Sequence, residues 1–198
     1  MCPMLRSVET VGRRERKKAQ TRQALAQAAM TLFLERGYDN VTVAEIAAAA
    51  DTALGTVFSH FPDGKESLIF DDGAERAAAL VAAVRDRPAG QAILGALRQF
   101  LAGRGPFRSD TTVEFRRKTE LIVNTPALRA YQLELWLRSQ DVLAEVIAAE
   151  CGRSAGDMDI RALARYVLMI PDLAGTEPDP RAALDVVFDL LEQGWRGA

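Results

Sequence analysis

The sequence predicts an all-α fold of about nine helices. Three observations support this prediction. Apolar residues recur at helical spacing along most of the chain, two short helical segments meet at a tight turn, and glycine and proline stand between the segments. The 198 residues are 48% hydrophobic, which is enough to bury a substantial core in one or two helical domains.

The tight turn lies within residues 42–61 and has clear local signals. Thr42 and Glu45 have the spacing of a capping box, in which each side chain satisfies a free backbone N–H group at the other position. The small residues 47–50 let a second helix cross closely, and Asp51 tolerates the left-handed backbone of a sharp turn. We therefore expect a helix-turn-helix.

The second helix of this unit is expected to begin at Thr52 or Ala53. Val57 and Phe61 then point toward the core, while the other side of the helix stays exposed. The exposed side includes Leu54, Gly55, Thr56, Phe58, Ser59 and His60. A helix with such a face can lie in the major groove of DNA.

The residues before this unit are basic. Residues 13–22 contain six basic residues and one acidic residue, a net charge of +5, just ahead of an apolar pattern that ends at Gly37. A charge run is often only solvated, but a basic arm in front of a first helix is placed to contact phosphates. The net charge of the whole chain is −2, so the position of the charge carries this inference rather than its total.

Many spaced residues between positions 13 and 72 closely resemble the N-terminal DNA-binding domain of TetR-type transcriptional regulators. The matching residues are Thr21-Arg22, Leu32-Phe33, Glu35-Arg36-Gly37-Tyr38, Thr42-Val43, Glu45-Ile46-Ala47, Gly55-Thr56-Val57-Phe58, His60-Phe61-Pro62, Lys65-Glu66 and Leu68. The resemblance implies a DNA-binding helix-turn-helix domain over 13–65 and a ligand-sensing and dimerisation domain over 66–198. Residues 1–12 are expected to be disordered.

The resemblance also implies which residues contact DNA. We expect Leu54 and Thr56 to read bases, and Thr42, His60, Lys65 and the basic arm to hold phosphates. The complete expected set is Thr42, Thr52, Leu54, Gly55, Thr56, Phe58, Ser59, His60 and Lys65. Asp51-Thr52-Ala53-Leu54 stands where the family usually has Gly-Val-Ser-Arg, so the serine cap of the second helix is lost. Phe58 replaces a common tyrosine, and Gly64 adds one residue before Lys65.

Six further helices are predicted after the helix-turn-helix, over 65–87, 89–102, 110–123, 126–151, 157–173 and 180–195. Asp63 and Glu66 are spaced as a capping box for the first of these helices, and Gly73 lies inside it, where bending could relay a signal.

The last two helices carry apolar stripes that resemble, by position, the dimer-forming helices of the family. The stripes are Ile160-Leu163-Ala164-Val167-Leu168 and Leu184-Val187-Phe188-Leu191-Trp195. The sequence thus predicts a homodimer that places two recognition helices on a near-palindromic DNA site.

A small, mostly apolar effector is expected to bind among the sensor helices. Its candidate contacts are Phe100, Phe115, Tyr131, Trp136 and Met169, with Arg116, Arg117 and Glu120 as polar candidates. Aromatic residues at helical spacing also suit a packed core, and charged residues suit a solvated helix face, so both interpretations stay open.

Composition argues against several other classes. The chain has one histidine and two cysteines, which leaves no metal cluster and no nucleophile with a histidine and an acid, so we expect no enzyme, no metal and no cofactor. No signal peptide and no apolar run of about 20 residues is found, so a cytoplasmic protein without membrane contact is expected. The leading hypothesis is a ligand-responsive repressor; an activator or a constitutive DNA binder of the same fold is the alternative.

Overall fold

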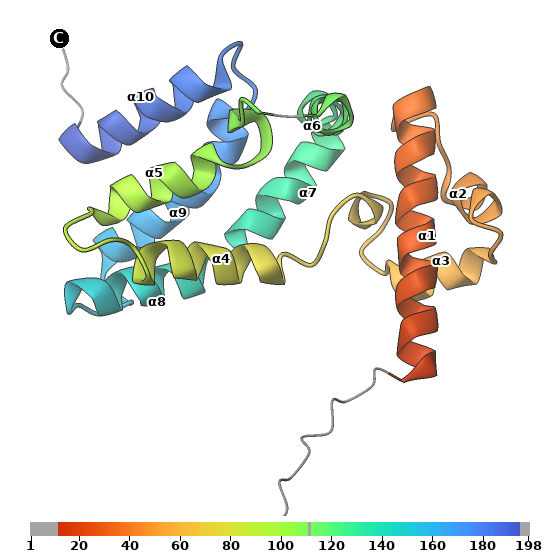
Figure 1. The fold of residues 1–198 in the computed structure, drawn as a ribbon, viewed down its shortest axis with the longest axis horizontal. Helices are drawn as coiled ribbons and strands as arrows, with labels where there is room; N and C mark the ends of the chain where they lie inside the picture. Colours follow the sequence, from red (N-terminus) through yellow and green to blue (C-terminus); the bar gives the residue numbers. More distant parts are fainter. Residues whose placement is uncertain (1–11, 111, 195–198) are drawn as a thin grey trace, which may run out of the picture. The chain divides into compact units, whose positions relative to one another are not determined.

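A computed structural model describes residues 12–110 and 112–194, which form ten α-helices and two short 3-10 turns without a strand (Figure 1). These residues divide into two units, one ending at Ile69 and one beginning at Phe70. The disorder expected for residues 1–12 falls almost wholly outside the described residues, as does Trp195. No helix in the described ranges is both long and apolar enough to cross a bilayer.

The first unit is built on the long helix α1 (Arg13–Arg36), against which α2 (Val43–Ala49) packs, followed by α3 (Leu54–His60) and the 3-10 turn η1 (Glu66–Leu68). Its core contains Leu25, Ala29, Phe33, Tyr38, Val41, Ile46, Ala47, Val57, Phe61, Leu68 and Ile69, all buried. Gly37 ends α1 with φ +82°, as predicted. The expected arm ahead of the first helix is wrong, because residues 13–22 are themselves the first turns of α1.

The corner between α2 and α3 follows its sequence signals. The Thr42–Glu45 capping box is present, and Asp51 takes the left-handed conformation with φ +50°. Val57 and Phe61 are buried, as predicted. The corner is therefore specified by local sequence.

The second unit contains α4 (Ala74–Arg85), α5 (Ile93–Ala102), the 3-10 turn η2 (Gly105–Phe107), α6 (Val113–Asn124), α7 (Pro126–Leu137), α8 (Gln140–Cys151), α9 (Met158–Ala174) and α10 (Pro180–Gln193). Helix α9 contacts α7, α8 and α10, and α4 contacts α5 and α8. One apolar core includes Leu80, Val84, Leu97, Leu101, Trp136, Leu143, Ile147, Val167, Leu168 and Phe188.

The predicted helix over 65–87 is wrong. The chain makes the turn η1, leaves it, and begins α4 only after Gly73, whose φ of +80° is left-handed. The side chains of Asp71 and Asp72 accept from the N–H groups of Gly73 and Ala74, which fixes this start. The capping box predicted from Asp63 and Glu66 has no long helix to cap, and the Glu66 carboxylate accepts from the Tyr38 hydroxyl.

Two other predictions about the helices need correction. The helix over 126–151 is broken at Arg138 and Ser139, and these two residues separate α7 from α8. The stripes assigned to a partner surface form the core of their own unit, since Ile160, Ala164, Val167, Leu168, Leu184 and Phe188 are buried.

Candidate nucleic-acid interface and effector cavities

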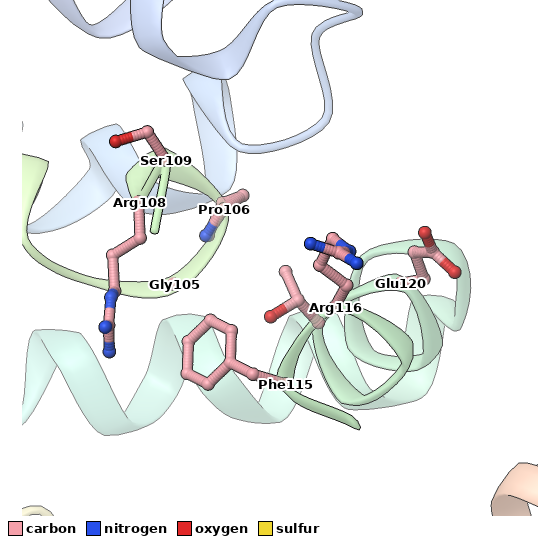
Figure 2. Close-up of a pocket in the computed structure, with 8 residues that line it drawn as sticks. Gly105, Pro106, Arg108, Ser109, Phe115, Arg116 and Glu120 are labelled. Atoms are coloured by element: carbon pink, nitrogen blue, oxygen red, sulfur yellow. The ribbon is translucent and has the colours of Figure 1, made fainter. Parts of the chain in front are cut away.

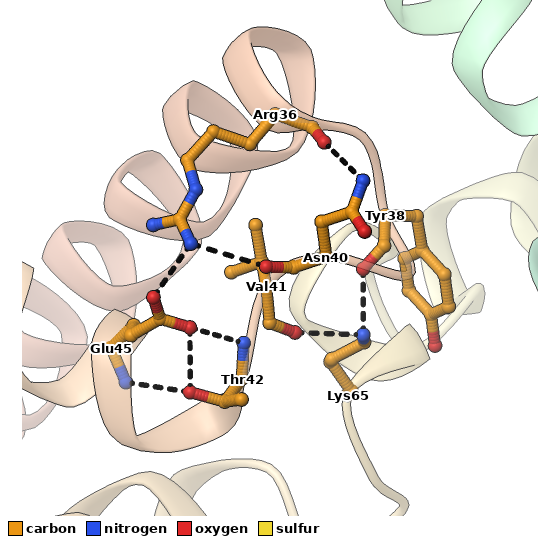
Figure 3. A network of polar contacts seen from close by, with 7 residues as sticks. All are labelled: Arg36, Tyr38, Asn40, Val41, Thr42, Glu45 and Lys65. Atoms are coloured by element: carbon orange, nitrogen blue, oxygen red, sulfur yellow. Dashed lines mark hydrogen bonds and ion pairs between the residues drawn. The ribbon is translucent and has the colours of Figure 1, made fainter.

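A polar network fixes the start of α2 (Figure 3). The Glu45 carboxylate accepts from the Thr42 N–H at 2.8 Å, the Thr42 hydroxyl at 2.7 Å and the Arg36 guanidinium at 2.6 Å. These bonds, with the Thr42 backbone bond the strongest cause, lower the pKa of Glu45 to about 2. The Thr42 hydroxyl also accepts from the Glu45 N–H, so its donor and one acceptor position are used within the cap.

Lys65 is held by the backbone of the segment between α1 and α2. Its Nζ donates to the carbonyl oxygens of Tyr38 at 2.7 Å and Val41 at 2.9 Å, and lies 3.8 Å from the centroid of the Tyr38 ring (Figure 3). Burial lowers the pKa of Lys65. The pKa of Tyr38 is raised, mainly by burial and next by its hydrogen bond to the Glu66 carboxylate. The structure thus directs Lys65 into the protein.

Helix α3 presents large apolar side chains to the outside. Leu54 and Phe58 are 44% and 52% exposed, whereas Val57 between them is buried. Ala53 at the N-cap makes no side-chain hydrogen bond to the helix, and Thr52 does not replace it. The first N–H groups of α3 therefore have no side-chain cap.

The other end of α3 is fixed by α1. The Arg22 guanidinium donates to the His60 carbonyl at 2.6 Å and lies 4.2 Å from the Phe61 ring centroid. The His60 Nδ1 atom is buried and lacks a hydrogen-bond partner among the described residues. Arg22 thus contributes to positioning α3, a role that charge counting alone did not reveal.

The remaining basic residues of this segment differ from Arg22. Arg13, Arg14, Arg16, Lys17 and Lys18 are all exposed on the first turns of α1. Gly55, Thr56 and Ser59 lie on α3, of which Gly55 and Ser59 are exposed and Thr56 is half-buried. A Cβ atom at Gly55 would meet open space, so no neighbour within the chain requires glycine there.

The second unit contains a cavity of about 240 Å³ between η2 and α6 (Figure 2). It is lined by residues that include Pro106, Arg108, Ser109, Phe115, Arg116 and Glu120. The Arg108 guanidinium lies 5.1 Å from the Phe115 ring centroid. The structure thus brings Phe115 together with two of the polar candidates.

A second cavity of about 170 Å³ lies between α4, α5, η2, α7 and α9. Its lining includes Arg76, Leu101, Arg104, Gln132, Trp136 and Pro171. Of the predicted aromatic contacts, only Trp136 reaches this cavity. Phe100, Tyr131 and Met169 line neither cavity: Phe100 lies beside the Arg104 guanidinium, Tyr131 beside Phe70, and Met169 is exposed on α9.

Sequence reasoning missed Arg76, although a signal was available. Positions 76, 80 and 84 share one face of α4, and Leu80 and Val84 on that face are buried. A basic residue in line with buried apolar residues indicates a charged group turned toward the interior.

Two family profiles match the chain. The profile for bacterial regulatory proteins of the tetR family matches residues 25–71, and the profile for the MftR C-terminal domain matches residues 91–196. The first contains α2 and α3, and the second extends from just before α5 through α10.

Individual proteins agree with these profiles. The chain is 33% identical over 166 residues to the HTH-type transcriptional regulator TcmR of Streptomyces glaucescens, covering 80% of this chain and 71% of TcmR. It is 27% identical over 189 residues to the HTH-type transcriptional repressor AcnR of Corynebacterium diphtheriae, covering 89% and 92%. The solved structure of the Thermus thermophilus repressor FadR aligns with a TM-score of 0.56 and 25% identity, over 89% of this chain and 97% of FadR.

The chain therefore belongs to the TetR family of transcriptional regulators, as the resemblance of residues 13–72 implied. It has the family's N-terminal helix-turn-helix and helical C-terminal domain. Because its relatives are transcriptional regulators, it is a DNA-binding regulator and not an enzyme.

Proposed function

We propose that this protein is a ligand-responsive transcriptional repressor that binds a near-palindromic operator as a homodimer and is released by a small effector. The observation that carries the DNA-binding part is the outer face of α3, where Leu54 and Phe58 are exposed although both are large and apolar. Exposed apolar groups of this size on a short helix favour a contact surface. AcnR, which aligns with 89% of this chain, is named as a repressor.

Leu54 and Thr56 are proposed to read base edges, since an apolar side chain recognises the thymine methyl group and a hydroxyl recognises polar base edges. Thr52, Gly55, Phe58, Ser59 and His60 are proposed to lie against the DNA backbone. The exposed arginine and lysine side chains at the start of α1 add positive charge that can attract the DNA phosphates.

Of the expected phosphate contacts, Thr42 and Lys65 are proposed to have different roles. Thr42 keeps a proposed phosphate contact through its exposed side chain, beside its role as a cap. Lys65 is proposed to stabilise the domain instead, because its Nζ is already bonded to two carbonyl oxygens.

The homodimer is proposed to form through the outer faces of α9 and α10. Tyr166, Met169 and Leu173 share one face of α9 and are exposed, as are Val186 and Leu190 on α10. An apolar patch of this kind on two adjacent helices favours burial against a second copy. This surface replaces the buried stripes that the sequence suggested.

The effector is proposed to bind in the second unit, in the cavity between η2 and α6 or in the cavity lined by Trp136 of α7. The FadR structure, determined in complex with lauroyl-CoA, supports the idea that a chain of this architecture takes up a small molecule. By linkage, the effector must bind free protein more tightly than the DNA complex by the same factor with which it weakens DNA binding.

In vitro selection from random duplexes tests this proposal. The wild-type protein is expected to enrich a motif with two inverted half-sites, and Leu54→Ala is expected to relax preference at one position in each half-site. Val113→Ala, which truncates an exposed apolar side chain in the second unit, serves as the matched control and should select the wild-type motif.

Failure to enrich any motif would contradict the proposal. When a motif is enriched, transcript levels in a deletion strain separate repressor from activator: transcripts of the genes next to the selected operator rise if the protein represses them and fall if it activates them.

A further inference from the structure

The cavity at Trp136 contains hydrogen-bond donors that lack acceptors. Nε and Nη2 of Arg76 and Nε1 of Trp136 are buried, and none has a hydrogen-bond partner in the described part of the chain. Both residues line the cavity, and the Arg76 guanidinium lies 4.8 Å from the centroid of the Trp136 ring. Because buried donors are normally paired, this group of donors points to a ligand that supplies acceptors.

The cavity also carries positive charge. Arg104 lines it as well, and burial lowers the pKa of both Arg76 and Arg104, with Arg104 further lowering that of Arg76. Asp71 and Asp72 oppose this shift in Arg76 through their charge, but neither carboxylate accepts from Arg76 Nε or Nη2; Oδ1 of each accepts instead from the N–H group of Gly73 or Ala74. The two unused buried donors of Arg76, together with the half-buried Arg104 that lines the same cavity, favour an anion.

The remaining lining is apolar. Leu101, Phe107 and Pro171 form other parts of the wall, and the volume of about 170 Å³ holds roughly six groups of water size. This space suits an anionic head with a short apolar body.

We propose that this cavity binds the carboxylate of a small organic acid, with Arg76 as the charged partner and Trp136 Nε1 as a further donor. The carboxylate accepts from the Arg76 fork, while the hydrocarbon part lies against Leu101, Phe107 and Pro171. This inference rests on the proposed effector-responsive function, and it replaces a mostly apolar effector with an acidic one.

Gly73 connects this cavity to the start of α4. A Cβ atom at Gly73 would lie 2.6 Å from Arg76 Nη2, so the Arg76 guanidinium lies directly against this glycine, whose φ of +80° disfavours other residues. Gly73 is the N-cap of α4 and follows the end of the first unit by only four residues. A carboxylate that draws Arg76 into the cavity would therefore change the packing at the start of α4.

Ligand binding is measured by fluorescence in the full chain carrying Trp195→Phe, which leaves Trp136 as the only tryptophan. The probes are straight-chain carboxylates from butanoate to octanoate, their neutral amides, and inorganic phosphate. At least one carboxylate is expected to give a saturable signal and to bind about tenfold or more tightly than its amide, the ratio typical of a charge-assisted contact. Amides that bind as tightly as the acids, or no saturable binding by any carboxylate, would overturn the proposal.

Variants of Arg76 test the assigned partner. Arg76→Gln is expected to weaken carboxylate binding about tenfold or more, and Arg76→Lys to weaken it less, because lysine keeps the charge but loses the fork. The matched control is Arg85→Gln on the same helix, an exposed arginine paired with Asp86, which should bind like wild type. If both variants fold and bind the carboxylate as tightly as wild type, Arg76 is not its charged partner.

Two further outcomes are informative. Phosphate that competes at equal affinity would show a site for inorganic anions and would overturn the carboxylate assignment. A carboxylate that binds through Arg76 but leaves operator affinity unchanged would preserve the site and contradict its effector role, which separates this inference from the proposed function.

Discussion

The guanidinium of Arg22 in α1 donates to the carbonyl oxygen of His60, the last residue of α3, at 2.6 Å. The same group covers the Phe61 ring at 4.2 Å. A basic residue of the N-terminal charge run thus satisfies an end carbonyl of α3. Cations at a helix C-terminus also interact favourably with its dipole.

Arg22→Ala is expected to lower the free energy of unfolding by about 1 kcal/mol and to weaken operator binding, because α3 loses a partner at its end. Thermal melting and fluorescence anisotropy check these effects. Arg22→Lys keeps the charge but loses the planar fork, so it should also lower stability. If Arg22→Lys behaves like wild type, charge rather than positioning explains the effect.

Ala53→Ser is expected to stabilise the protein by roughly 0.5–2 kcal/mol, since it restores a side-chain cap to α3. Operator binding should strengthen as well, because a capped α3 is already ordered in the free protein and less binding free energy is then lost in ordering it on DNA. Urea unfolding provides the measurement, and Ala78→Ser within the exposed surface of α4 is the control. Equal effects of both substitutions would show that Ala53 is not a vacant cap.

Glu45 should make stability depend on pH in the acid range. Its pKa is about 2 in the folded protein against 4.5 ordinarily, so its stabilisation is complete above about pH 5 and is lost as the pH falls through 2. The stability difference between wild type and Glu45→Gln should therefore be constant near neutral pH and shrink below pH 4.5. Urea unfolding across this range checks it, and a constant difference at all pH values would contradict the assignment.

Lys65→Ala is expected to lower the free energy of unfolding by about 2 kcal/mol through the loss of charged donors to Tyr38 and Val41, with little change in the salt dependence of DNA binding. Lys17→Ala, at an exposed position on α1, should do the opposite and reduce the salt slope by about one unit without altering stability. If Lys65→Ala leaves stability intact and reduces the salt slope, Lys65 is a phosphate contact.

Local signals made the first unit predictable. The Thr42–Glu45 spacing and the tolerance of Asp51 for a left-handed backbone depend only on neighbouring residues, so the corner between α2 and α3 could be inferred from sequence. The interruption before Gly73 was missed because apolar residues recur on both sides of it, and helical spacing does not reveal a left-handed residue that ends one segment and begins another.

Long-range relationships were less accessible. The approach of Arg76 to Trp136 joins α4 to α7, and the packing of Ile160 or Leu184 into their own unit depends on which helices become neighbours. An apolar stripe shows that a face is buried but does not identify what covers it. Only the three-dimensional structure distinguishes the exposed apolar residues of α9 and α10 from the buried ones.

The central claim is that two copies of this chain place two recognition helices on one operator. Native mass spectrometry of the protein with its selected operator duplex tests it most directly. Two chains per duplex are expected for wild type, and Leu173→Glu, which places a charge in the exposed face of α9, should weaken this assembly. A stable complex with one chain per duplex, unaffected by Leu173→Glu, would contradict the account.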